Sequence, residues 1–267
     1  MYFCGEPLKT VMSVSQHYIA KFRSWKQTER ELCLAPLQQL MENLTDPTKK
    51  DYFTFTGQAM EEESWMEKTE IVNDAFRTHT FWLLKTFIAV YLNDHQKARE
   101  FVAKLMKCDL ANCNCVSFFQ TYFLDSLVDV LLARDKSNGG GKAKRYKTSL
   151  KKLRFYGKDA PANVKNKISL IEAEVDVLKH GKKSSSTAMS KFHDSIEEAK
   201  QEGLLFEEAY ACERCAIAML EWGDMTRSLE YFERARNLYQ QWGSPVKVSQ
   251  LMKYVEENCG VKMQKQG

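Results

Sequence analysis

The sequence predicts an all-α fold, an α-solenoid of antiparallel helix pairs. Apolar residues recur at spacings of three and four, as on one face of a helix, and no segment shows the period-two alternation typical of a strand. Glycine often closes a helix in the left-handed conformation. Twenty residues separate Gly203 from Gly223, and twenty more separate Gly223 from Gly243, so one helix-sized unit occurs twice. Helix pairs that recur in this way bury their apolar faces by stacking on their neighbours.

The composition indicates a folded protein but not a function. Of 267 residues, 44% are hydrophobic and 12% aromatic, so we expect one helical domain over residues 1–267. The net charge of +4 is too small to indicate a nucleic-acid or membrane partner by itself. We expect a cytoplasmic protein without membrane insertion, because no apolar run approaches the roughly 18 residues of a spanning helix and no signal peptide is visible. The eight cysteines then act as reduced, small hydrophobic residues.

The first half of the chain predicts two helix pairs followed by an apolar helix. Thr28 and Glu31 form a capping box at the start of the second helix, and Asp46 before Pro47 ends it. Asp94 caps the helix that completes the second pair. The apolar spacing predicts helices over 7–23, 28–44, 64–92 (mostly helical), from Asp94 to about 105, and 116–134.

The second half predicts shorter helices separated by glycines. Residues 136–142 form a flexible Gly-rich loop, because each of three consecutive glycines costs a helix about 1 kcal/mol. Pro161 and Pro245 fall in first turns, where a missing N–H costs nothing. Helices are expected over 143–156, 161–179, 187–202, 206–222 and 225–242, with a C-terminal capping helix over about 245–258.

A small–aromatic–small pattern occurs in two of these helices. The residues are Ala188, Phe192 and Ser195 in one helix, and Ser228, Phe232 and Ala235 forty residues later. Their spacing is similar to the set by which tetratricopeptide repeats pack their second helix. Small residues let two helices approach, and the phenylalanine fills the space between them. The predicted fold is therefore a tetratricopeptide-like α-solenoid.

Two further motifs carry a wider resemblance. Residues 207–213 read Glu-Glu-Ala-Tyr-Ala-Cys-Glu, and residues 239–248 read Tyr-Gln-Gln-Trp-Gly-Ser-Pro-Val-Lys-Val. They resemble Glu-Glu-Ala-Leu-Ala-Asn-Glu and Tyr-x-x-Trp-Gly-Ala-x-Ala-Lys-Val in the tetratricopeptide-like C-terminal helical region of large multidomain signalling ATPases. That family combines protein-kinase, AAA-type ATPase and sensor histidine-kinase or cyclase domains. The glycines at 139–141, the cysteines at 212 and 215 and the Lys183–Ser186 tract depart from its pattern.

The resemblance implies a non-catalytic protein-protein interaction or regulatory module in signal transduction. Its partner would be a protein, a peptide or neighbouring domains of the same polypeptide. In tetratricopeptide folds the first helices of successive pairs line the concave face. This geometry makes four residues of one such helix the candidate partner-binding groove: Tyr210, Glu213, Ile217 and Glu221.

The densest basic run offers an alternative function. One face of its helix carries Lys147, Lys151, Arg154 and Lys158, and another face carries Tyr146, Leu150 and Leu153. Such a cationic face is in most proteins simply a solvated surface. The functional alternative is a basic scaffold that binds nucleic acid or an acidic partner through residues 142–158.

The sequence predicts no catalytic, cofactor or metal site. Residues 139–142 lack the spacing and the Ser/Thr of a phosphate loop, and no kinase catalytic-loop or Asp-Phe-Gly motif is present. Cys113 and Cys115 lie about a hundred residues from Cys212 and Cys215, which does not match the ligand spacing of structural zinc sites. An enzyme, whether ATPase or kinase, is therefore the least favoured reading.

Overall fold

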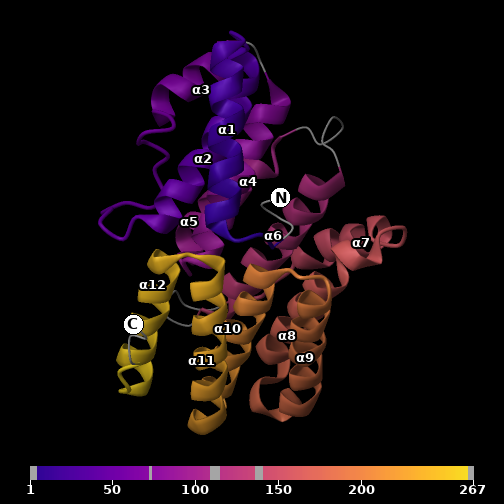
Figure 1. Cartoon of the computed structure of the whole chain (residues 1–267). Helices are drawn as coiled ribbons and strands as arrows, with labels where there is room; N and C mark the ends of the chain where they lie inside the picture. The colour runs from indigo at the N-terminus through magenta and orange to yellow at the C-terminus, as the bar shows by residue number, and fades with distance from the viewer. Residues whose placement is uncertain (1–4, 72–73, 109–114, 136–140, 264–267) are drawn as a thin grey trace.

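The computed structural model describes residues 5–71, 74–108, 115–135 and 141–263, which form twelve α-helices and no strand (Figure 1). The predicted all-α class is confirmed. Residues 136–140 of the predicted Gly-rich loop lie outside the described part. The helices are α1 (Leu8–Ser24), α2 (Thr28–Thr45), α3 (Glu62–Ile71), α4 (Ala75–Tyr91), α5 (His95–Leu105), α6 (Cys115–Arg134), α7 (Tyr146–Tyr156), α8 (Lys165–His180), α9 (Ser185–Gln201), α10 (Leu205–Glu221), α11 (Met225–Trp242) and α12 (Pro245–Cys259).

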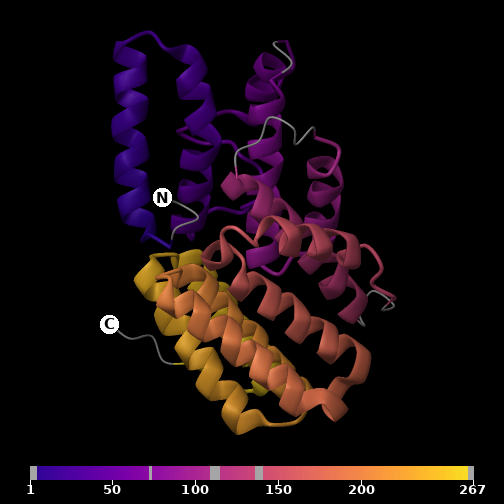
Figure 2. The same ribbon diagram turned by 90° about the vertical axis from the view of Figure 1, so that its right-hand side faces the viewer.

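Most helices pack chiefly against their neighbour in the chain. The pairs are α1 with α2, α4 with α5, α6 with α7, α8 with α9, and α10 with α11. Figure 2 shows α1–α5 in one half of the molecule and α8–α12 in the other, with α6 between them. The two halves also meet directly, because α12 contacts α2 and the Ser244 hydroxyl donates to the Leu44 carbonyl at 2.9 Å. Contacts far apart in sequence therefore hold the two halves together.

Local sequence explains several helix starts. Asp94 and Asp224 accept the backbone N–H of the third residue of α5 and α11, and Ser244 does the same for α12. Asp74 caps α4 in this way, so the helix predicted over 64–92 is divided into α3 and α4. Pro245 occupies the first turn of α12, as predicted.

The capping box predicted at Thr28 and Glu31 is not formed. Helix α2 begins at Thr28, but its N-cap position is Gln27 and no side chain caps it. The Glu31 carboxylate instead accepts from Arg23 Nε of α1 at 2.7 Å. A pairing between two helices has therefore replaced a local cap.

The small–aromatic–small sets are buried, as predicted for packing residues. Phe192 and Phe232 are both fully buried. The Ser195 hydroxyl of α9 donates to the Asn166 carbonyl of α8 at 2.8 Å, and the Ser228 hydroxyl of α11 donates to the Ala216 carbonyl of α10 at 2.9 Å. Small side chains here let each helix approach the backbone of its partner.

Candidate functional site

Helix α10 lies in the interior of the molecule. Every residue from Phe206 to Met219 is buried, although four of them are charged. Tyr91 of α4 packs on Tyr210, with ring centroids 4.5 Å apart. Phe206, one turn before Tyr210, packs on Tyr91 at 5.6 Å and on Trp242 of α11 at 5.4 Å. Neighbours from both halves of the chain therefore surround this helix.

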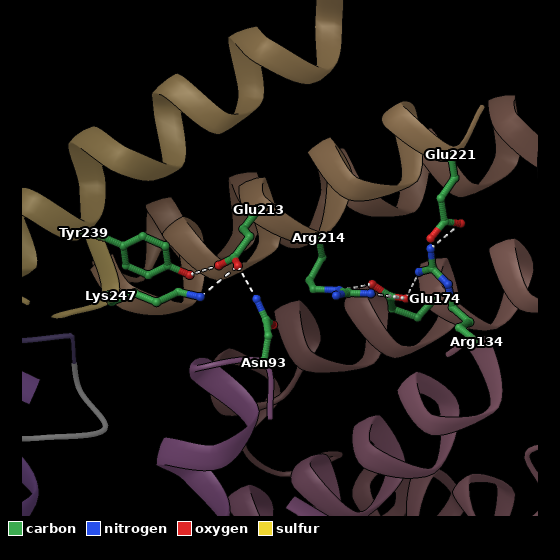
Figure 3. Close-up of polar contacts among 8 residues, drawn as sticks. All are labelled: Asn93, Arg134, Glu174, Glu213, Arg214, Glu221, Tyr239 and Lys247. Carbon is green, nitrogen blue, oxygen red and sulfur yellow. Dashed lines mark hydrogen bonds and ion pairs between the residues drawn. The ribbon is translucent and has the colours of Figure 1, made fainter. Parts of the chain in front are cut away.

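The Glu213 carboxylate joins three elements to α10 (Figure 3). It accepts from Lys247 Nζ of α12 at 2.8 Å, from the Tyr239 hydroxyl of α11 at 2.6 Å and from Asn93 Nδ2 of the α4–α5 turn at 2.7 Å. Burial lowers the pKa of Lys247 and, together with the Glu213 charge, raises the pKa of Tyr239 well above its ordinary value. Glu213 thus connects α10 to α11, α12 and the α4–α5 turn inside the fold.

A second buried cluster surrounds Glu174 of α8 (Figure 3). Its carboxylate accepts from Arg214 Nε of α10 at 2.7 Å and pairs with the Arg134 guanidinium of α6. Burial alone raises the pKa of the Glu174 carboxyl, but the two guanidiniums outweigh it, so this pKa lies below its ordinary value. Arg134 also pairs with Glu221 at 2.9 Å.

These contacts correct the position expected for the partner-binding groove. Tyr210, Glu213 and Ile217 are 0%, 1% and 7% exposed, so a partner cannot reach them in this arrangement. Glu221 is exposed, but Arg134 holds it. Residues of α4, α6 and α12 cover the face of α10 that repeat geometry alone would leave open.

Helix α7 differs from α10, because its charged side chains face solvent. Tyr146, Leu150 and Leu153 are buried, and α7 packs chiefly on α6. The predicted apolar face is therefore confirmed. The four cations predicted for the other face are all exposed: Lys147, Lys151, Arg154 and Lys158.

Two aspartates of α6 position the start of α7. Asp129 Oδ2 accepts the Tyr146 backbone N–H at 3.0 Å, which replaces a local N-cap. Asp125 accepts the Ser149 hydroxyl at 2.6 Å and pairs with Arg145 at 3.2 Å. Burial raises the pKa of Asp125. Sequence reasoning missed this anchor; its signal was a pair of acids four residues apart in an otherwise apolar helix.

A cavity of about 340 Å³ separates α7 from α8. Its charged lining comes from both sides: Lys147 and Arg154 of α7, Glu172, Asp176 and Lys179 of α8, and Lys191 of α9. Arg154 pairs with Glu172, and Lys191 pairs with Asp176 at 2.8 Å. Among the described residues, no carboxylate lies within ion-pair distance of Lys147 or Lys179. This cavity, which we call the α7–α8 groove, therefore keeps uncompensated positive charge.

Two exposed aromatic side chains lie at the C-terminal end of α7. Phe155 is 62% exposed and Tyr156 is 43% exposed. Lys158 Nζ lies 5.8 Å from the Phe155 ring centroid. We define the α7 face as Lys147, Lys151, Arg154, Phe155 and Lys158. It combines a positive surface with one large apolar side chain.

The remaining candidates offer less chemistry. A cavity of about 740 Å³ lies along α12, but two of its charges, Lys262 and Glu256, pair with each other at 3.3 Å. Cys212 and Cys215 are buried, and burial raises the pKa of the Cys212 thiol to about 12. Cys113 lies outside the described residues. Over the described ranges no three His, Cys, Asp or Glu side chains are grouped as metal ligands would be.

Known protein families, curated proteins and solved structures include no match to this chain. Its function is therefore inferred from its own sequence and geometry. None of the helices in the described ranges has the length and apolar character needed to cross a bilayer.

Proposed function

We propose that this chain is a non-catalytic interaction module that binds an acidic segment of a protein on the α7 face. The observation that carries the proposal is the charge of residues 142–158. They contain eight lysines and arginines and no aspartate or glutamate. Lys147, Lys151 and Lys158 are exposed and have no acidic partner among the described residues.

The shape of α7 suits a short peptide. Its eleven residues span about 16 Å, the length of about five residues of extended chain. Carboxylates of such a segment would meet the lysines, which speeds association and selects against basic partners. An apolar residue of the segment would pack on Phe155, as buried aromatic contacts often supply most of the binding energy in protein interfaces.

A protein partner fits the α7–α8 groove better than nucleic acid does. Glu172 and Asp176 line the α8 side of the groove, directly across from α7. Nucleic acid carries a charge on every phosphate and would meet these carboxylates. A peptide can place its acidic residues on the α7 side only.

The fold and the sequence resemblance support a regulatory setting. The helix pairs and the buried small–aromatic–small sets favour a tetratricopeptide-like solenoid. By resemblance, the acidic segment would belong to ATPase or kinase domains of a cytoplasmic signalling protein, in the same polypeptide or in a partner. Binding would then regulate their nucleotide turnover. ATP hydrolysis by this chain alone would contradict the non-catalytic part of the proposal.

The test is fluorescence anisotropy with a short labelled peptide rich in aspartate and glutamate and containing one tryptophan. The double variant Lys147→Glu/Lys151→Glu should weaken binding by about tenfold or more, and added salt should weaken binding to the unmodified chain. The control is Lys182→Glu/Lys183→Glu, which makes the same charge change at two exposed lysines of the α8–α9 turn. Equal losses in both variants, or tighter binding of a single-stranded DNA of equal charge, would overturn the proposal.

A further inference from the structure

Thr148 presents a free hydroxyl on the outside of α7. Its side chain is exposed and makes no hydrogen bond with other described residues. Three threonines inside other helices, by contrast, donate to the carbonyl four residues earlier: Thr78, Thr86 and Thr121. Thr148 stands in the first turn of α7, so the residue four positions earlier, Lys144, precedes the helix. The neighbouring Ser149 is buried and bonded to Asp125.

Positive side chains surround this hydroxyl. Lys144, Arg145 and Lys147 precede Thr148 by four, three and one residues. Lys151 and Lys152 follow at three and four residues, which places them beside Thr148 on the helix surface. Protein kinases select substrates by such charge patterns. An arginine three residues before a hydroxyl, with further lysines beside it, matches a kinase whose cleft is acidic.

We propose that Thr148 is a phosphorylation site for a serine/threonine kinase that prefers basic sequences, and that its phosphate closes the α7 face to acidic segments. The second part rests on the proposed function above. In the reaction, Thr148 Oγ1 attacks the γ-phosphorus of ATP, the bond to the ADP oxygen breaks, and the hydroxyl proton passes to a base of the kinase. The product is phosphothreonine and ADP.

The phosphate would act by charge and leave the fold intact. It adds a charge of about −1.5 to −2 at neutral pH and three acceptor oxygens. Lys151 and Lys152 are within reach on the helix surface and would pair with it. A negative group in the first turn also interacts favourably with the helix dipole, so α7 should remain helical. The partner would lose Lys151 and would meet a phosphate instead.

The test treats the full chain with a kinase that prefers basic sequences and Mg-ATP, and maps the phosphate by mass spectrometry. The proposal expects phosphate on Thr148 and none on a Thr148→Ala variant. The acidic peptide should bind the phosphorylated chain about tenfold more weakly, with unchanged circular dichroism. Thr148→Ala should bind as the unmodified chain does, before and after kinase treatment. Thr148→Glu should weaken binding, whereas Thr187→Glu, at an exposed threonine of α9, should not.

The outcomes distinguish failure of the Thr148 proposal from failure of the proposed docking function. Phosphate found elsewhere, for example on Ser186, overturns the assignment of Thr148. Phosphate on Thr148 with unchanged peptide binding overturns the switch and leaves the docking site standing. If the untreated chain does not bind the peptide, the proposed function fails, and the mass spectrum still decides whether Thr148 is modified.

Discussion

The Lys247 ammonium lies 2.8 Å from the Glu213 carboxylate, and both side chains are buried, at 0% and 1% exposure. The pair connects the last helix to the central helix α10. Asn93 reaches the same carboxylate from the α4–α5 turn. The buried side chains of α10 therefore hold the two halves of the chain together.

Breaking this buried pair from one side should be strongly destabilising. Lys247→Met leaves the Glu213 charge buried without its cation, and we expect the free energy of unfolding to fall by about 3–5 kcal/mol in urea titrations. Lys253→Met is the matched control, because Lys253 pairs with Glu257 at 3.7 Å on the exposed surface. Its expected effect is within about 0.5 kcal/mol. Similar losses in the two variants would contradict the role given to Glu213.

The two buried tyrosines beside this network should respond differently to loss of their hydroxyls. The Tyr210 hydroxyl is buried and has no hydrogen-bond partner among the residues that the structure describes, whereas the Tyr239 hydroxyl donates to Glu213 at 2.6 Å. Tyr210→Phe should leave the free energy of unfolding unchanged or raise it by up to about 1 kcal/mol. Tyr239→Phe should lower it by about 1.5–3 kcal/mol, because it removes a bond to a charged group. The reverse order in urea titrations would show that this geometry is wrong.

Stability should fall as the pH is lowered from 6.5 towards 4. His79 is fully buried, with Nε2 2.9 Å from the Thr121 hydroxyl, and burial lowers its pKa to about 4. The unfolded chain keeps a histidine pKa of about 6.5, so between these values it binds more protons than the folded chain. Across this window His79 alone would contribute a loss of about 3 kcal/mol. His95, whose pKa burial also lowers to about 4, adds to the effect.

Urea titrations between pH 7 and pH 4.5 check this dependence. His79→Leu removes one of the two titrating groups and should flatten the fall in stability, whatever it costs at pH 7. His17→Leu, at an exposed position of α1, should leave the slope as it is. An unchanged slope in His79→Leu would mean that the ring is not held neutral in the folded chain.

A side chain at Gly5 should destabilise the contact between the start of the chain and the α9–α10 turn. Gly5 has φ of +80°, and a Cβ atom there would lie 2.2 Å from the Gly203 carbonyl oxygen. Gly5→Ala should therefore cost more than the roughly 1–2 kcal/mol of a left-handed alanine alone. Gly223→Ala is the control, because Gly223 has a similar φ of +84° but open space around it. Equal melting temperatures for the two variants would show that Gly5 is not packed against this turn.

The helices could be predicted from sequence because their signals are local. The apolar spacing around Phe232, the cap at Asp224 and the Trp-Gly end at Gly243 all lie within one helix length of each other. The outward cations of α7 were predictable for the same reason, since the helical period of about 3.6 residues places Lys151 and Arg154 on a different face from Leu150 and Leu153. Local periodicity therefore gave both the fold class and the exposed candidate surface.

The interior position of α10 could not be predicted in this way. Charged residues such as Glu213 and Arg214 are typical of the exposed face of a helix, and their partners lie far away in the sequence. Asn93 is 120 residues from Glu213, and Glu174 is 40 residues from Arg214. The acidic side of the α7–α8 groove was hidden for the same reason, because Glu172 belongs to another helix. A charge pattern in one helix does not show which distant groups will neutralise it.

The most direct test of the docking surface is zero-length crosslinking of the chain to the acidic peptide with a carbodiimide, followed by mass spectrometry. This reagent joins a carboxylate to an amine only where the two are in contact. We expect the dominant crosslinks at Lys147 and Lys151 of α7 and at Lys158 just after it, all of which are exposed, and their loss in high salt. Crosslinks spread evenly over the exposed lysines, or concentrated on Lys253 of α12 and on Lys262 after it, would contradict the assignment of the α7 face.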